Sequence, residues 1–314
     1  MSKAQSISLW SLDFSQKPWF TLFIFMTKFI ENRKKRRKPE KSVVVFYHAD
    51  CTDGFTAAWA AWKKFGDKAE YIAHFHQDEP LPFKNKKVYT LDITFPEPVT
   101  KRLIRDNIFV TSIDHHKSTK DITLSTYKPL FSLDNSGCVL AWKYFHPKKS
   151  IPKFLLSVED LDIWRFKIKG TRELYAYLDL FDFSFKNWSS FVRNFENKEK
   201  RKKMLDMGAV IVKYENKEIE RQIKKNARVV KFEGYKIYAV NTTFNTNLVG
   251  DRLRYLLPPF SVMWKQNNLG MILVSLRGDG TVDTSLIAKK YGGGGHRDAS
   301  AFRLPSIKNI PWTT

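Results

Sequence analysis

Short apolar runs alternate with amphipathic stretches between residues 43 and about 165. The runs Val43 to Tyr47, Val88 to Leu91 and Val110 to Ile113 have the length and the β-branched content of buried strands. Stretches with helical spacing lie among them: Phe55 to Phe65, Pro96 to Asn107 and Gly137 to Phe145. The alternation predicts an α/β fold with a doubly wound, mainly parallel sheet.

The second half of the chain has a different pattern. Residues 186–228 are lysine-rich and lack proline, which predicts a helical connection. Strand-like runs at Val229 to Val240, Ser261 to Trp264 and Leu269 to Leu276 then predict a smaller α/β domain. The predicted parts are a basic arm (1–41), a larger α/β domain (42–185), a helical linker (186–228), the smaller domain (229–306) and a tail (307–314).

Acidic residues and histidines follow the first three strands. The string His48-Ala-Asp-Cys-Thr-Asp-Gly follows the first strand, Asp92 the second, and the triplet Asp114-His-His the third. Because the carboxyl ends of parallel strands line one crevice, these side chains are expected to converge. Imidazole and carboxylate ligands suit Mn²⁺ or Mg²⁺, and several carboxylates allow two ions about 3.5–4 Å apart. The pattern predicts a binuclear phosphoester hydrolase.

Composition and charge bear on the cellular compartment and on the kind of binding partner. Cys51 and Cys138, the two cysteines among 314 residues, form neither a disulfide framework nor a CxxC metal motif. A reducing compartment is therefore expected, and we predict a cytoplasmic protein. The formal charge of +22 favours a polyanionic partner such as RNA, although lysine-rich solvated helices would give the same sign.

The first 41 residues are set apart by their basic composition. Trp19 to Met26 is too short to span a bilayer, which takes roughly 20 residues, so no stable membrane insertion is expected. The arm is expected to be disordered or, since Met26 could be the true start, partly an artefact of start-site assignment.

The ordered motifs resemble the DHH phosphoesterase superfamily over about residues 43 to 305. The resemblance rests on DHH at Asp114, the string that begins at His48, the isolated Asp92 and the acidic motif SVEDLDIW. It also rests on GGGGHRDASAF, from Gly292 to Phe302, which resembles the glycine-rich motif of the DHH-associated C-terminal domain. DNSGCVLAWKYF beside VEDLDIWRF most resembles the nano-RNase and cyclic-nucleotide phosphodiesterase-like branch.

This resemblance implies a role for each motif residue. One Mn²⁺ would be held by His48, Asp50 and Asp92, and the other by Asp53, His115, Asp160 and a bridging Asp92. The two ions would hold a hydroxide aimed at phosphorus. Asp114 and His116 are the implied catalytic residues, Asp114 by fixing the His115 ring and His116 by facing the phosphate oxygens.

Two positions leave alternatives open. Asp50 and Asp53 are three residues apart, whereas most relatives space these aspartates by two, so alignment on Asp53 places Cys51 where an aspartate is expected. A thiol is a poor ligand for Mn²⁺, so either Asp50, as the resemblance implies, or another group would complete the first metal site. Asp162 is the rival of Asp160, and the string LSVED favours Asp160.

The smaller domain is implied to bind the substrate. Its predicted contacts to a terminal phosphate or base are Arg277, Gly292, Gly293, Gly294, Gly295 and His296. A glycine hinge without ligand contacts is the alternative.

The predicted function is a Mn²⁺-dependent phosphodiesterase, with Mg²⁺ as the second candidate ion, that hydrolyses short oligoribonucleotides or cyclic or linear dinucleotides. A pAp phosphatase or a single-strand exonuclease is the alternative among enzymes. A catalytically dead nucleotide-binding module is the alternative from another class. The expected partner is a short RNA or nucleotide substrate, and a homodimer is left open.

Overall fold

Residues 41–75 and 78–313 are described in this computed structural model. The expectations for the basic arm fall on residues 1–40, which lie outside the described residues.

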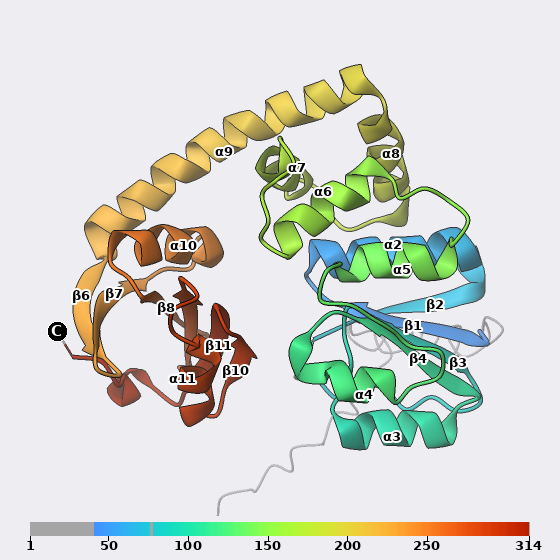
Figure 1. Cartoon of the computed structure of the whole chain (residues 1–314), viewed down its shortest axis with the longest axis horizontal. Coiled ribbons are helices and arrows are strands. Elements are labelled where there is room, and N and C mark those ends of the chain that lie inside the picture. The colour runs from blue at the N-terminus through green and yellow to red at the C-terminus, as the bar shows by residue number, and fades with distance from the viewer. Residues whose placement is uncertain (1–40, 76–77, 314) are drawn as a thin grey trace, which may run out of the picture. The chain divides into compact units, whose positions relative to one another are not determined.

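The larger sheet contains five parallel strands in the order β2-β1-β3-β4-β5 (Figure 1). The strands are β1 (Val43–His48), β2 (Ala69–His74), β3 (Lys87–Leu91), β4 (Phe109–Asp114) and β5 (Leu130–Phe131). The predicted α/β class with a parallel sheet is confirmed. Strands β1, β3 and β4 are neighbours, so the three motif-bearing strands end side by side.

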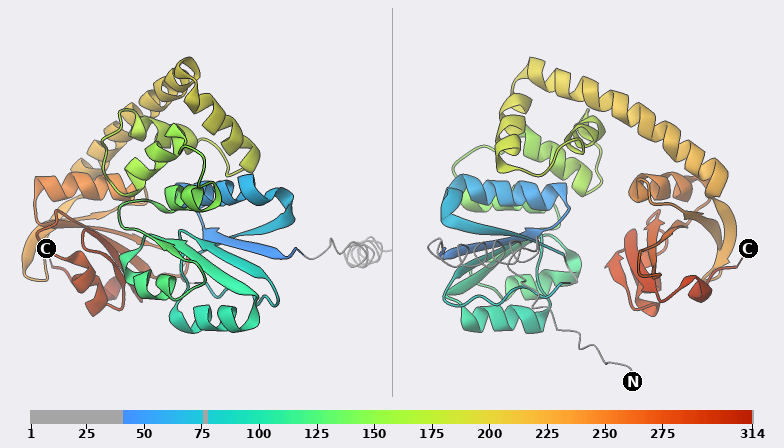
Figure 2. Two further views of the ribbon diagram at one scale, coloured as in Figure 1. Left: turned by 45° about the vertical axis from the view of Figure 1, so that its right-hand side comes forward. Right: turned by 180° about the vertical axis from the view of Figure 1, so that it is seen from behind.

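Helices cover both faces of this sheet, with α2 and α5 on one face and α3 and α4 on the other (Figure 1; Figure 2). These helices are α2 (Thr52–Phe65), α3 (Glu97–Asp106), α4 (Lys120–Leu124) and α5 (Gly137–Phe145), and two short 3-10 turns are η2 (Gly66–Lys68) and η3 (Lys117–Thr119). Successive side chains of β1 point to opposite faces of the sheet. Val45 packs in the core under α2, while Val44 and Phe46 pack in the core that contains Leu103 of α3.

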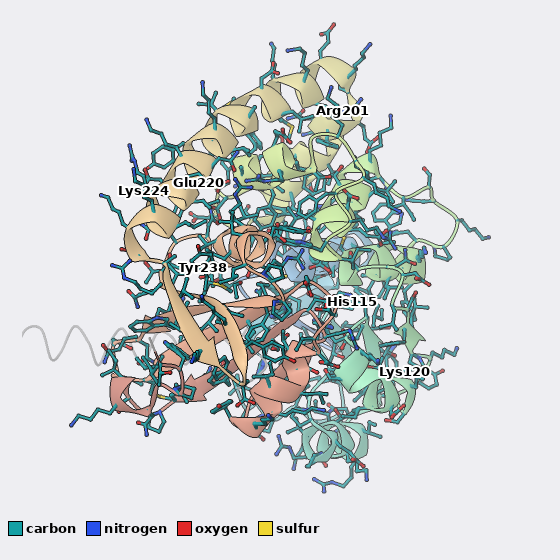
Figure 3. The ribbon with its side chains drawn as sticks, turned by 60° about the vertical axis from the view of Figure 1, so that its left-hand side comes forward. His115, Lys120, Arg201, Glu220, Lys224 and Tyr238 are labelled. Atoms are coloured by element: carbon teal, nitrogen blue, oxygen red, sulfur yellow. The ribbon has the colours of Figure 1, made fainter. Side chains whose placement is uncertain are left out.

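Four helices follow this sheet: α6 (Lys153–Asp162), α7 (Thr171–Leu178), α8 (Phe185–Glu196) and α9 (Lys198–Asn226). The stretch predicted as helical is thus two helices, separated at Asn197. The Asn197 side chain caps α9 by accepting from the amides of Glu199 and Lys200. Arg201, Glu220 and Lys224 mark successive positions along α9 in Figure 3.

The smaller sheet is mixed and has the order β10-β11-β9-β8-β7-β6. Its elements are β6 (Arg228–Phe232), β7 (Tyr235–Asn241), α10 (Thr246–Leu256), β8 (Phe260–Gln266), β9 (Ile272–Gly278), α11 (Thr284–Lys290), β10 (Gly294–His296), β11 (Ala299–Leu304) and the 3-10 turn η4 (Ile307–Asn309). The run predicted as one strand, Val229 to Val240, is a hairpin. Glu233 and Gly234 have φ of 50° and 84°, the backbone that a two-residue hairpin turn requires.

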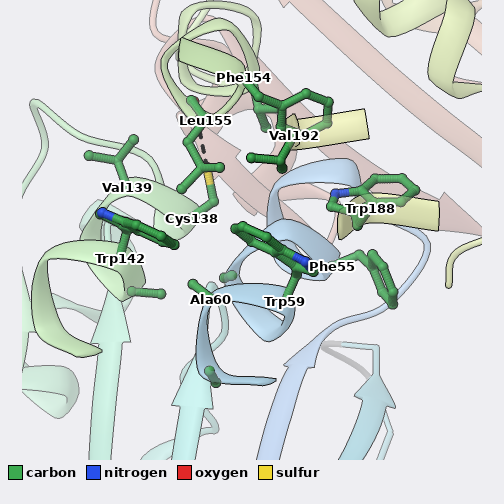
Figure 4. Packing of buried hydrophobic residues seen from close by; sticks show 14 of the residues in the cluster. Phe55, Trp59, Ala60, Cys138, Val139, Trp142, Phe154, Leu155, Trp188 and Val192 are labelled. Atoms are coloured by element: carbon green, nitrogen blue, oxygen red, sulfur yellow. Dashed lines mark hydrogen bonds between the residues drawn. The ribbon is translucent and has the colours of Figure 1, made fainter. Parts of the chain in front are cut away.

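The core between α2, α5 and α8 is aromatic (Figure 4). Trp59 stacks on Trp142 with ring centroids 5.7 Å apart, and the indole N–H of buried Trp188 donates to Thr56 Oγ1 at 2.8 Å. The Cys138 thiol donates to the Leu155 carbonyl oxygen at 3.8 Å. These contacts fix α2 and α5, and so the positions of the amino ends of both helices at the end of the sheet.

None of the helices within residues 41–75 and 78–313 has both the length and the apolar character that crossing a bilayer requires.

Candidate metal centre

Acidic and imidazole side chains gather at the carboxyl ends of β1, β3 and β4. His48 is the last residue of β1, Asp92 follows β3 directly, and Asp114 is the last residue of β4. The chain turns sharply at Asp92, whose φ is 57°. The convergence expected from the strand order is therefore present in the structure.

Asp92 lies at the middle of the cluster and is almost fully buried, with an exposed fraction of 1%. Its Oδ2 oxygen is 3.3 Å from His48 Nδ1, and its Oδ1 oxygen is 3.1 Å from His115 Nε2. Burial opposes ionisation, but the hydrogen bonds from His115 and His48 outweigh it, so the pKa of Asp92 lies below its usual range. Each carboxylate oxygen thus faces a different histidine.

Asp53 is held by the amino end of α5. Ser136 Oγ donates to its Oδ1 at 2.6 Å, and the Cys138 amide donates to the same oxygen at 3.1 Å. Burial and the charge of Asp92 nevertheless raise the pKa of Asp53 to about 6. A Cβ atom at Gly137 would lie 2.5 Å from Asp92 Cβ and 2.8 Å from Asp53 Oδ2, so only glycine allows α5 to approach this closely.

Ser136 and the Cys138 amide were not among the predicted site residues. The signal was present, because a serine before a glycine and an apolar run is typical of a helix N-terminus. That pattern does not say which carboxylate the helix end will face.

Asp162, at the end of α6, faces the same centre. Its Oδ2 oxygen is 3.5 Å from His115 Nε2. Within residues 41–75 and 78–313 this oxygen is the one buried side-chain polar atom without a hydrogen-bond partner. Burial and the charges of Asp53 and Asp92 raise its pKa well above the usual value.

The ligand atoms fall into three groups in which all lie within 4.8 Å of one another. The groups are His48, Cys51 and Asp92; Asp92, His115 and His116; and Asp53, His115 and Asp162. Crowded carboxylates with an unpartnered buried oxygen are the arrangement that a divalent cation stabilises, and the oxygen and nitrogen donors suit Mn²⁺ or Mg²⁺. The residues present therefore fit a metal centre.

Two predicted ligands lie outside these groups. Asp160 is buried, and its carboxylate accepts from the amides of Lys167 and Ile168 and from Thr171 Oγ1, at 2.9, 3.0 and 2.7 Å. Asp50 is exposed, has a φ of 51°, and lines a pocket of about 180 Å³ beside Asp179. The structure brings Asp162 and Cys51, rather than Asp160 and Asp50, to the cluster.

Asp114 interacts with the neighbouring histidine rather than with the ring of His115. Its Oδ1 is 2.7 Å from His116 Nδ1 and accepts from the His115 amide at 2.7 Å, while Thr119 Oγ1 donates to Oδ2 at 2.9 Å. Burial disfavours the His116 imidazolium, but the hydrogen bond and charge of Asp114 outweigh it and raise the pKa of His116.

Of the predicted substrate-binding residues, Arg277 lies on β9, Gly294 to His296 form β10, and Gly292 and Gly293 directly precede β10. The His296 ring lies against that of His116, with centroids 5.6 Å apart and an interplanar angle of 30°. Arg277 donates to the Leu276 carbonyl at 2.7 Å and to Asn247 Oδ1. Burial and the nearby charge of Arg254 lower the pKa of Arg277 to about 10.

The glycine run packs partly against the protein itself. A Cβ at Gly293 would lie 2.1 Å from the Ala301 carbonyl oxygen, whereas one at Gly294 would have nothing within 4 Å. Part of this run is therefore needed for the pairing of β10 with β11, and Gly294 faces open space.

Comparison with solved structures places the fold among DHH-domain proteins. The chain is similar to a pGpG-specific phosphodiesterase from Vibrio cholerae, with 14% identity, a TM-score of 0.51, and coverage of 86% of this chain and 95% of that one. It is also similar to the DHH domain of a member of the s1p family of ribosomal proteins, with 12% identity, a TM-score of 0.57, and coverage of 90% and 94%. The fold is that of the DHH domain proteins.

Among curated proteins, the chain is 32% identical over 293 residues to the uncharacterized protein R106 of Acanthamoeba polyphaga mimivirus, a match that covers 84% of this chain and 68% of that protein. The chain belongs to the same family as that protein. No family model matches this chain.

Proposed function

We propose that the protein is a metal-dependent phosphoester hydrolase that cleaves short oligoribonucleotides or small cyclic or linear dinucleotides. The observation that carries this proposal is the Asp92 carboxylate, whose two oxygens face His48 on one side and His115 on the other. A carboxylate shared in this way is suited to bridge two divalent ions.

One ion would be held on the side of His48 and the Asp92 Oδ2 oxygen. The other would be held by Asp53, His115 and Asp162 together with the Asp92 Oδ1 oxygen, and the unpartnered Asp162 oxygen supports Asp162 as a ligand in place of Asp160. When bound, two Mn²⁺ or Mg²⁺ ions would lower the pKa of a water molecule and neutralise phosphoryl oxygens.

His116 is proposed to act on the phosphate or the leaving oxygen. Asp114 holds its Nδ1 at 2.7 Å and favours the protonated ring, which can donate a hydrogen bond or a proton. This is a positioning role for Asp114 and a catalytic role for His116.

The groups on β9 and β10 are proposed to bind the remaining phosphate or base. His296 lies next to His116, and Arg277 supplies a cation that is already destabilised by burial and by Arg254, so an anion would relieve it. The shared fold with a pGpG-specific phosphodiesterase supports a substrate of dinucleotide size. pAp and longer single strands are the competing substrates.

A substrate panel tests this proposal. The full chain, reconstituted with Mn²⁺ or Mg²⁺, is assayed on di- to octaribonucleotides, cyclic dinucleotides, pAp and pyrophosphate. We expect the highest kcat/KM on di- to tetranucleotides. Highest kcat/KM on pAp or on the longest strands would favour the alternatives.

A catalytically dead nucleotide-binding module would behave differently. It would bind members of the panel without turning any of them over, and metal analysis after reconstitution would find no stoichiometric ion. About two ions per chain together with turnover is the result expected of the enzyme.

A further inference from the structure

Among the ligand groups formed by residues 41–75 and 78–313, one sulfur atom occurs, and it belongs to Cys51. This residue is the N-cap of α2, and its sulfur accepts from the Gly54 amide at 3.5 Å. The same sulfur lies 3.7 Å from Asp92 Oδ2, the oxygen that is 3.3 Å from His48 Nδ1. Nitrogen, sulfur and oxygen donors from three segments therefore face one another.

The two sides of the centre have different chemistry. The groups around Asp92 Oδ1 offer oxygen and imidazole nitrogen, the donors of a hard to borderline ion. The group around Asp92 Oδ2 adds sulfur, which favours softer ions such as Zn²⁺, Co²⁺ or Fe²⁺ over Mn²⁺.

We propose that Cys51 is a thiolate ligand and that it makes the centre asymmetric, with a softer ion on the side of His48 and Cys51 and a Mn²⁺-type ion on the side of Asp53 and Asp162. The inference rests on the proposed binuclear function and specifies one of its two ion positions.

The assignment rests on the geometry, because the electrostatics of the metal-free protein disfavour a thiolate at this position. Without a cation, burial and the charges of Asp92, Asp162 and Asp53 raise the pKa of the Cys51 thiol well above its usual value. A coordinated divalent ion reverses this balance, because a coordinating thiol is deprotonated outright. The amide of Gly54 and the amino end of the 14-residue helix α2 then stabilise the thiolate.

Capping alone would not need a sulfur atom. Serine and aspartate are strongly preferred at this position, so Cys51→Ser and Cys51→Asp should keep or improve the cap while removing the thiolate. The second cysteine supplies a matched control, because Cys138 is buried in the core and its thiol donates to Leu155. Its serine variant removes a sulfur that lies outside the three ligand groups.

Cobalt spectroscopy on the full chain tests the assignment. The metal-free protein is titrated with Co²⁺ under reducing, anaerobic conditions, and binding is also quantified by metal analysis. In the wild type and in Cys138→Ser we expect a sulfur-to-cobalt charge-transfer band in the near ultraviolet. In Cys51→Ser and Cys51→Asp that band should be absent, while the visible ligand-field bands of bound cobalt remain.

Competition between ions gives a second readout. Cys51→Ser should lower the affinity for Zn²⁺ by more than the roughly 10- to 100-fold that loss of an outer-shell partner costs. Cys51→Asp should shift the preference from Zn²⁺ toward Mn²⁺. Equal Zn²⁺ affinity in wild type and Cys51→Ser would overturn the proposal.

The failures can be told apart. Bound cobalt without the charge-transfer band in the wild type, or with an unchanged band in Cys51→Ser, would overturn the ligand assignment and leave the proposed hydrolase standing. Absence of any bound cobalt, zinc or manganese would overturn the proposed function and this assignment together.

Discussion

The ends of the two sheets contain groups of opposite charge. In both regions, burial and neighbouring like charges disfavour the ionised form. At the first sheet, carboxylates crowd together and the pKa of Asp53 is raised to about 6. On β9, partial burial and the nearby charge of Arg254 lower the pKa of Arg277 to about 10. Each region holds like charges that burial disfavours, so the first is suited to cations and the second to an anion.

A phosphate ester bound with divalent ions would supply both counter-charges. The comparison therefore supports the proposed division of roles, in which the first sheet would bind metal and β9 and β10 would bind substrate.

Asp92→Ala should abolish turnover. The side chain contacts His48 and His115, one on each side of the centre, so its loss should remove both ions and lower kcat/KM by at least about 10³-fold, equivalent to several kcal/mol of transition-state stabilisation. Steady-state kinetics and metal analysis measure the effect, and circular dichroism checks the fold. Turnover close to the wild-type rate would break the proposed mechanism.

His296→Ala and Arg277→Ala should leave the bound metal unchanged and lower kcat/KM on oligonucleotides. Loss of one charge-assisted contact costs about 1.5–3 kcal/mol, or roughly 10- to 150-fold. Bis(p-nitrophenyl) phosphate, which offers little to bind, should be affected much less. Arg303→Ala, an exposed arginine on β11, is the control for lost charge.

The decisive quantity is the ratio of the losses on the two substrates within each variant. Equal losses on both, or a loss of metal, would mean that β9 and β10 belong to the catalytic centre or are structural.

Asp160→Asn and Asp162→Asn should have opposite effects. Asp160 accepts three hydrogen bonds, so its variant should lower the free energy of unfolding of the metal-free protein by about 1.5–3 kcal/mol and still bind metal. The Oδ2 oxygen of Asp162 has no hydrogen-bond partner, and the charges of Asp53 and Asp92 outweigh the nearby His115, so its variant should be as stable as the wild type or more so, and should lose the stabilisation that metal confers.

Urea denaturation with and without Mn²⁺ measures both effects. The reverse pattern would restore Asp160 as the ligand.

Gly293→Ala and Gly294→Ala should give the smallest effects. Together they distinguish a glycine that packing requires from one that faces open space. The Gly293 variant would press on the Ala301 carbonyl and should cost about 1–3 kcal/mol of stability. The Gly294 variant should change stability by no more than about 0.5 kcal/mol, since nothing lies within 4 Å of its Cβ. Lower oligonucleotide affinity in a stable Gly294 variant would indicate close approach of the substrate backbone at this position.

Local patterns predicted the sheet and the convergence of His48, Asp92 and His115, because strand periodicity and the parallel-strand rule act at short range. They favoured Asp160 over Asp162, whereas the structure places the Asp162 carboxylate among the ligand groups. That choice depends on the loop after α6, whose amides at Lys167 and Ile168 fold back to satisfy Asp160.

The same limit applies at the start of α2. The prediction began this helix at Phe55, whereas it begins at Thr52 with Cys51 as its cap. Asp50 adopts a left-handed backbone with φ of 51°, and Cys51, not Asp50, has its side chain among the ligand groups. Residue type alone does not reveal that Asp50 adopts this left-handed conformation, which decides which side chain reaches the cluster.

The close approach of α5 also constrains how related sequences can diverge. Any side chain at Gly137 would occupy the space of the Asp53 and Asp92 carboxylates. A lineage that keeps both aspartates should be unable to replace this glycine, while one that has lost the metal centre is free to do so. An aligned relative with a larger residue here should therefore also have lost Asp53 or Asp92, so this single position would identify relatives in which the carboxylate cluster is incomplete.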